Sequence, residues 1–161
     1  MKKLKIYIDT SVVSHLEHED APEKRKDTQK LWENIKNGHY SVIISDVMLA
    51  ELFKTPEPKR SLFAYHINEI PYENIEVTDD ILSLAEKFID FGILKQKSLD
   101  DCRHIAAAIV TDCDLIVSWN FKHIVNPKTI RGAKVIAASE GYKDIIICTP
   151  TMLVEEANDD E

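Results

Sequence analysis

Short apolar runs alternate with longer amphipathic segments along most of the chain. The runs are rich in Val and Ile, and they cover Leu4–Ile8, Ser41–Ser45, Asn74–Val77, Leu115–Ser118 and Asp144–Cys148. Short runs of β-branched residues are typical of parallel strands that are buried on both faces. We therefore expect about five strands in the interior of the protein.

The segments between these runs carry apolar residues at helical spacing. They predict helices over Asp27–Lys36, Asp46–Lys54, Asp79–Phe91 and Leu99–Thr111. Because strands alternate with helices, the pattern indicates an α/β sandwich around a parallel sheet.

Several residues mark where helices begin and end. Ser45, Thr78 and Thr149 precede helical patterns and are suitable N-caps, and Pro127 and Pro150 stand at first helical positions. The segment Thr55–Pro58 separates one helix from the next.

The 161 residues, 44% of them hydrophobic, suit one domain of ordinary size. We expect this domain to span residues 1–157, with an acidic tail at 158–161. No apolar run approaches the ~20 residues that cross a bilayer, and the N-terminal apolar stretch is too short for a signal peptide. Cys102, Cys113 and Cys148 are odd in number and widely spaced, which predicts reduced thiols in a cytoplasmic protein.

The net charge of −8 argues against a protein that coats nucleic acid through bulk positive charge. It does not argue against an enzyme whose acids surround a metal ion. The four glycines form neither G-x-G-x-x-G nor a Walker loop, and no Ser occupies a G-x-S-x-G elbow. The chemistry-bearing side chains at strand ends and first helical turns are carboxylates.

Asp9 follows the first predicted strand directly. In a parallel α/β sheet, binding sites lie beyond the carboxyl ends of the strands, so this position favours a functional acid. The structural alternative is an N-cap for a helix that begins within the segment 10–17.

Glu51 and Asp101 lie in predicted helices near the same edge of the sheet. Glu51 has apolar neighbours and only a thin polar face around it, whereas Asp46 is explained as a first-turn helix acid. Asp101 follows Ser98 at capping-box spacing, so structure alone could explain it, with Asp100 as its exposed neighbour.

Asn120 follows the fourth predicted strand, while Asp112 and Asp114 precede that strand and belong to the opposite edge. Asp9, Glu51, Asp101 and Asn120 are thus expected to converge. Carboxylates that lie close together raise one another's pKa unless a cation neutralises them. Oxygen ligands without paired Cys or His point to Mg²⁺ or Mn²⁺.

The segments "YIDTSVVS", "SDVMLAEL", "DDCRHIAAAIVTDCDLIVSWNFKHI" and "IIICTPTMLVEE" resemble a PIN domain, over about residues 5–156. The chain is most similar to small prokaryotic VapC-like toxins. The resemblance implies a three-layer α/β/α sandwich with a central, mainly parallel sheet of about five strands. It also implies a metal-dependent ribonuclease that acts on RNA, forms a homodimer and is neutralised by a small antitoxin.

The same resemblance assigns the site. Asp9, Glu51 and Asp101 match the family acids that hold the metal, and Asn120 stands where many members have a fourth acid. Thr10 or Ser11 matches a polar position that holds a water or a phosphate. Candidate phosphate contacts are Lys54, Lys59, Arg60, Arg103, Lys122 and Lys128.

Three further side chains near these positions have structural interpretations. His104 is expected to bond Asp101 or the backbone rather than to act as a base, with His123 as a second candidate base. Trp119 is expected at the edge of the core, although it could stack on a base.

Two other functions stay open at this point. One is a catalytically inactive PIN-like module that binds RNA or protein, which Asn120 and the negative charge favour. The other is a phosphatase of the haloacid-dehalogenase type, which requires an acid at the position of Ser11.

Overall fold

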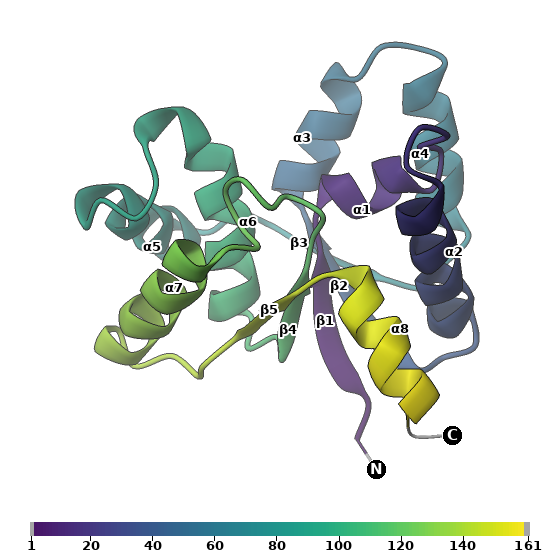
Figure 1. Ribbon diagram of the computed structural model, residues 1–161. Helices are drawn as coiled ribbons and strands as arrows, with labels where there is room; N and C mark the ends of the chain where they lie inside the picture. The colour runs from purple at the N-terminus through teal and green to yellow at the C-terminus, as the bar shows by residue number, and fades with distance from the viewer. Residues whose placement is uncertain (1, 160–161) are drawn as a thin grey trace.

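The computed structural model describes residues 2–159 and contains one five-stranded sheet in the order β3-β2-β1-β4-β5 (Figure 1). The strands are β1 (Leu4–Ile8), β2 (Tyr40–Ser45), β3 (Glu73–Ile75), β4 (Leu115–Val117) and β5 (Ile146–Cys148). All neighbouring strands are parallel. This confirms the predicted parallel sheet, although the third, fourth and fifth strands are shorter than predicted.

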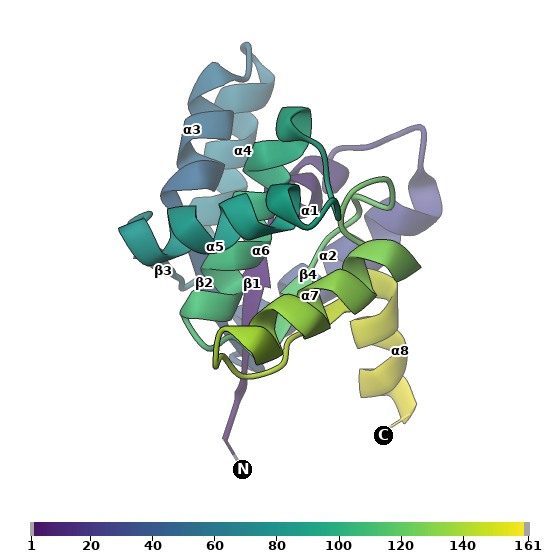
Figure 2. The same ribbon diagram turned by 90° about the vertical axis from the view of Figure 1, so that its left-hand side faces the viewer.

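Helices cover both faces of the sheet. They are α1 (Thr10–His15), α2 (Pro22–Lys36), α3 (Asp46–Lys54), α4 (Lys59–Asn68), α5 (Asp79–Asp90), α6 (Leu99–Val110), α7 (Pro127–Ser139) and α8 (Pro150–Asp159), with a 3₁₀ turn η1 (Gln96–Ser98) before α6. One layer contains α5, α6 and α7, and the other contains α1, α2, α4 and α8 (Figures 1 and 2). The predicted three-layer sandwich is confirmed. None of these helices is both long and apolar enough to cross a membrane.

The strand side chains alternate between two apolar cores. In β1, Tyr7 faces the core under α5–α7, whereas Ile6 and Ile8 face the core under α2 and α8. All three are fully buried. A strand covered by helices on both faces must be apolar at every position, which explains the continuous apolar runs.

The predicted caps of three helices are formed by side chains. Ser45 Oγ accepts a hydrogen bond from Val47 N at 3.2 Å. Thr78 Oγ1 and Thr149 Oγ1 each accept a hydrogen bond at 3.3 Å from the backbone N–H three residues later in the chain. These bonds satisfy backbone donors that a helix leaves free at its N-terminus.

The structure corrects several helix boundaries. Helix α2 begins at Pro22 rather than Asp27, because Pro is favoured in the first helical turn even without a side-chain cap. Helix α4 follows the predicted break at Thr55–Pro58. Its pattern of apolar residues is weak, because Phe63 and Ile67 are its only buried residues. Helix α8 includes Asn158, which belonged to the predicted tail, and residues 160–161 lie outside the described residues.

Candidate active site

Asp9 lies at the carboxyl end of β1 and is almost fully buried, with 3% of its surface exposed. Its Oδ1 accepts a hydrogen bond from Ser11 Oγ and its Oδ2 accepts one from Ser118 Oγ, both at 2.6 Å. Asp9 occupies the N-cap position of α1, but its side chain makes no capping bond. Its carboxylate therefore accepts one hydroxyl from the first turn of α1 and one from the residue that follows β4, and it caps no backbone N–H of the helix.

The sheet topology brings the Ser118 hydroxyl to Asp9, whereas Ser11 is only two residues away in the sequence. Strands β1 and β4 are neighbours, with Ile8 paired to Val117, so the residues that follow the two strands meet at the same edge. The chain leaves β1 toward β2 on one side and returns to β4 on the other. Such a switch in strand order is the usual position of a binding crevice in an open α/β sheet.

Glu51 and His104 form a pair between α3 and α6. His104 Nε2 donates to Glu51 Oε1, and His104 Nδ1 lies 2.6 Å from Tyr7 Oη. Tyr7 Oη in turn lies 2.7 Å from Ser45 Oγ. The prediction that His104 bonds Asp101 or the backbone is wrong, because the helix face that carries it is turned toward α3 and β1.

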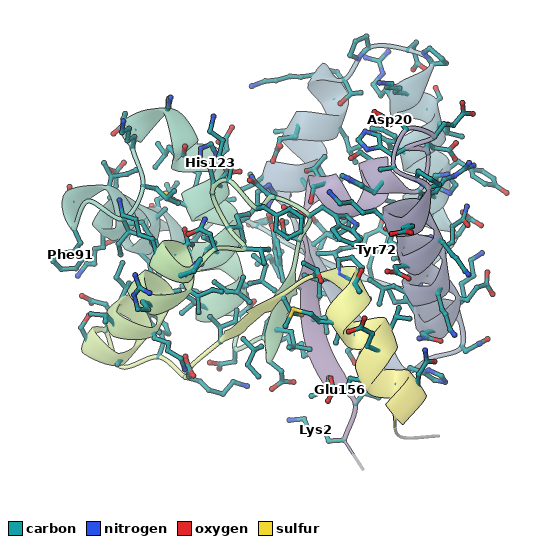
Figure 3. The ribbon with its side chains drawn as sticks, in the orientation of Figure 1. Lys2, Asp20, Tyr72, Phe91, His123 and Glu156 are labelled. Carbon is teal, nitrogen blue, oxygen red and sulfur yellow. The ribbon has the colours of Figure 1, made fainter. Side chains whose placement is uncertain are left out.

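Asp101 is held by the loop that follows β4. Asn120 Nδ2 donates to Asp101 Oδ1 at 3.2 Å, and His123 Nδ1 donates to Asp101 Oδ2 at 3.0 Å. The capping box suggested by Ser98 does not form, because the Ser98 side chain makes no capping bond. In Figure 3, His123 lies beside α6 at the end of the sheet where the strands finish.

Burial and mutual repulsion act on these groups together. Burial raises the pKa of Asp9 and also that of Asp101, and the charge of Glu51 raises both further. Burial alone lowers the pKa of His104, but the Glu51 hydrogen bond and the nearby carboxylate charges outweigh it and raise the pKa overall. Within residues 2–159, no Lys or Arg forms an ion pair with any of the three acids, so the side chains that balance their repulsion are histidines, serine hydroxyls and the Asn120 amide.

A sequence model of the PIN domain family matches residues 6–122, which include all four predicted site residues. The chain belongs to the PIN domain family. A comparison with curated protein sequences found no match.

Solved structures share the fold of this PIN domain. VapBC2 from Rickettsia felis, bound to a DNA fragment of its promoter, is similar with a TM-score of 0.56 and 12% identity, over 91% of this chain and 98% of that chain. Mycobacterium tuberculosis VapC20, described as a Sarcin-Ricin loop cleaving toxin, is similar with a TM-score of 0.56 and 13% identity, over 87% and 98% of the two chains.

The donor chemistry of this PIN domain fits a hard divalent cation. Carboxylate oxygens are the ligands that Mg²⁺ and Mn²⁺ prefer, and a cation would relieve the repulsion described above. Across residues 2–159, however, no group of three or more His, Cys, Asp or Glu side chains is arranged to hold a metal ion. Each acid instead bonds a neighbouring side chain, so coordination would require some of these bonds to be exchanged.

Asn120 has a structural role that a fourth acid could not fill. Its amide nitrogen donates to Asp101, and its Oδ1 accepts from the backbone N–H of His123 at 3.0 Å. An Asp at this position could keep the second bond but would repel Asp101. The departure from the family pattern thus replaces a repulsion with a hydrogen bond.

Two hydroxyls beside Asp9 differ in their availability. Ser11 Oγ donates to Asp9 and accepts from Trp119 N at 2.9 Å, so it is occupied. Thr10 Oγ1 is buried and has no hydrogen-bond partner among residues 2–159. Thr10 is therefore the hydroxyl with free hydrogen-bonding capacity, although a water or phosphate oxygen would reach this buried atom only if neighbouring groups moved.

The sequence missed Tyr7, Ser45 and Ser118 as site residues. All three could have been noticed as polar side chains within the predicted apolar strands. A buried hydroxyl such as that of Tyr7 needs a hydrogen-bond partner. Trp119 is buried as predicted, and its Nε1 donates to Thr28 Oγ1 at 2.9 Å.

Proposed function

We propose that this PIN domain is a metal-dependent endoribonuclease that hydrolyses RNA phosphodiester bonds, with Mg²⁺ or Mn²⁺ bound by Asp9, Glu51 and Asp101. One observation carries the proposal: three carboxylates from separate elements lie at one sheet edge, and no Lys or Arg is paired with them in the described residues. A cluster of carboxylates without a paired Lys or Arg is costly to a fold even when hydrogen bonds balance part of the charge. A site that binds a cation supplies a reason for keeping them.

A bound ion would lower the pKa of a water molecule and neutralise charge that develops on the phosphorus. The chain's own residues prepare the ligands. The hydroxyls of Ser11 and Ser118 orient Asp9. His104, supported by Tyr7, holds Glu51, and the Asn120 amide holds Asp101. Partners of this kind orient metal ligands and tune their basicity.

We extend the proposal to the partners. The two solved structures belong to a VapBC pair and to a VapC toxin, and we infer that this chain is the toxin of a type II toxin–antitoxin pair. It would act in the cytoplasm as a homodimer, a location consistent with three buried free cysteines. A small antitoxin would place an Arg or Lys against the acidic cluster, because clustered carboxylates attract cations of any kind.

The test is RNA cleavage with Mg²⁺ or Mn²⁺, compared with cleavage in EDTA. Asp9→Asn should abolish cleavage, because the amide has the size of the carboxylate but lacks its charge and its second acceptor oxygen. Asp112→Asn is the matched control: Asp112 is exposed at the opposite edge, and Asn tolerates its φ of 57°. Wild-type protein that cleaves no RNA, or full activity of Asp9→Asn, would refute the proposal.

The second candidate function is an inactive PIN module that binds RNA or protein. It is favoured by Asn120 in place of an acid and by the lack of a ready metal-holding group in residues 2–159. Calorimetric titration with Mn²⁺ separates the two. The nuclease should bind the ion and lose that binding in Asp9→Asn, whereas the inactive module should show no specific binding.

A further inference from the structure

A pocket of about 240 Å³ opens beside His123, between the segment that precedes α6 and the loop that precedes α7. Four lysines line it: Lys95, Lys97, Lys122 and Lys128. No Asp or Glu lines it, and all four lysines are exposed. Among residues 2–159, none of the four forms an ion pair or a side-chain hydrogen bond, so their charge is uncompensated in a protein of net charge −8.

The pocket on the other side of the candidate site has a different charge. It measures about 310 Å³ and is lined by Lys54 and Arg103 together with Asp46, Glu51 and Asp100. Arg103 Nη1 donates to Asp100 Oδ1 at 3.4 Å, so part of the positive charge is already paired. Of these two pockets, the one beside His123, here called the lysine pocket, presents cations without acids.

The lysine pocket shares a wall with the candidate active site. His123 lines the pocket and also donates to Asp101 at 3.0 Å. A ligand in the lysine pocket therefore lies one side chain away from a proposed metal ligand. A negatively charged strand that reaches the acidic cluster meets repulsion there, and the lysines beside His123 supply a compensating attraction that no acid in the same pocket cancels.

We propose that the lysine pocket binds a backbone phosphate of the RNA strand next to the bond that is cleaved. This inference rests on the proposed function. It adds that the RNA strand leaves the active site on the side of His123. Lysine ammonium groups contact phosphates as point charges without reading the bases. The pocket thus contributes affinity and register, but no sequence preference.

The test compares two charge-matched double variants. Lys122→Gln with Lys128→Gln removes two charges from the pocket. Lys3→Gln with Lys26→Gln removes two from exposed positions elsewhere, one of them at the amino edge of the sheet. Binding of a short fluorescent single-stranded RNA is measured in EDTA, which prevents metal-dependent cleavage, between about 50 and 200 mM salt. Thermal unfolding checks the fold of each variant.

A single-strand phosphate contact changes the slope of log affinity against log salt by about −0.7. Loss of two contacts should make this slope shallower by about 1.4. If wild type and pocket variant bind equally at 1 M salt, the variant should bind about 25-fold more weakly than the wild type at 0.1 M salt. The control double variant should bind as the wild type does. Equal losses in both double variants, or unchanged binding in the pocket variant, would overturn the inference. Unchanged RNA binding would also be the result if the pocket receives an acidic protein segment instead.

Failure of the inference can be told apart from failure of the proposed function. Wild-type cleavage with unchanged KM in the pocket variant would leave the nuclease standing and remove the phosphate subsite. No cleavage by the wild type, with RNA binding that depends on Lys122 and Lys128, would remove the nuclease and keep a phosphate-binding pocket.

Discussion

Replacement of Asn120 by Asp tests how the candidate site balances its charges. The Asn120 amide donates to Asp101 at 3.2 Å, and an Asp would lose that bond and add a negative charge. A hydrogen bond to a charged group contributes about 1.5–3 kcal/mol. Two carboxylates about 4 Å apart repel by about 4 kcal/mol at an effective dielectric constant near 20.

Partial exposure reduces these figures, because 24% of the Asp101 side chain is accessible and solvent screens the pair. We therefore expect Asn120→Asp to lower the free energy of unfolding by about 3 kcal/mol in EDTA at pH 7. For a chain of this length, that corresponds to a fall in Tm of about 6–12 °C. The bond from His123 N to position 120 should survive, so the loop itself should keep its conformation.

The pH dependence of this destabilisation has a definite sign. Repulsion raises the folded-state pKa of the carboxyl pair above the unfolded values, so the folded variant binds more protons. The destabilisation should be complete at neutral pH and should diminish as the pH falls through the raised values. Mg²⁺ or Mn²⁺ should diminish it too if the acids bind the ion.

The assay is thermal unfolding of wild type and variant in EDTA and in Mg²⁺, over a series of pH values. Asn68→Asp, at the exposed end of α4, is the control for an added charge and should change stability by only about 0.5 kcal/mol. If Asn120→Asp is as stable as the wild type in EDTA at pH 7, the Asn120 amide does not balance Asp101 and the electrostatic reasoning is wrong.

Three further substitutions have expected outcomes. In EDTA, Asp9→Asn should be no less stable than the wild type by thermal unfolding, because burial raises the pKa of Asp9 and its ionised form is destabilising at neutral pH. Tyr7→Phe leaves His104 Nδ1 without its buried hydrogen-bond partner and should lower the free energy of unfolding by about 1–3 kcal/mol. Urea titrations measure this loss, which a loss of RNA cleavage should accompany. Unchanged stability would contradict the buried bond between Tyr7 and His104. Asp114→Asn should be less stable than the wild type at neutral pH but not in acid, because hydrogen bonds from a backbone N–H and from Lys143 lower the pKa of Asp114 in the folded state. The stabilisation from these bonds disappears as the pH falls through that lowered pKa. Unfolding of both proteins at a series of acid pH values measures the difference, and a difference that persists in acid would contradict the reasoning.

The pattern of apolar runs was sufficient to predict the parallel sheet. Strands buried on both faces need apolar residues throughout, and this requirement is local and visible in the sequence. The edge strands were less well predicted, because β3 and β5 each pair with one neighbour and their ends are set by that pairing. Helix α4 was not delimited because only two of its residues reach the core.

The positions of the site residues followed from the same logic. Asp9 and Asn120 come after β1 and β4, so parallel pairing directs them to one edge. Glu51 lies in the second turn of α3, and Asp101 lies in the first turn of α6, which follows the turn η1, so these two acids reach the edge through helix packing. The family resemblance then supplied the expected chemistry for these positions.

Only the tertiary structure decided what each of these side chains contacts. The sequence allowed Asp9 and Asp101 to be helix caps, and it allowed His104 to bond Asp101. The observed partners are two serine hydroxyls for Asp9, the Asn120 amide for Asp101 and Glu51 for His104. Capping is a contact between residues close in sequence, which local spacing suggests. Apart from the bond between Ser11 and Asp9, the observed bonds join residues 19 to 109 positions apart, and that separation is closed only when β1, β4, α3 and α6 pack together.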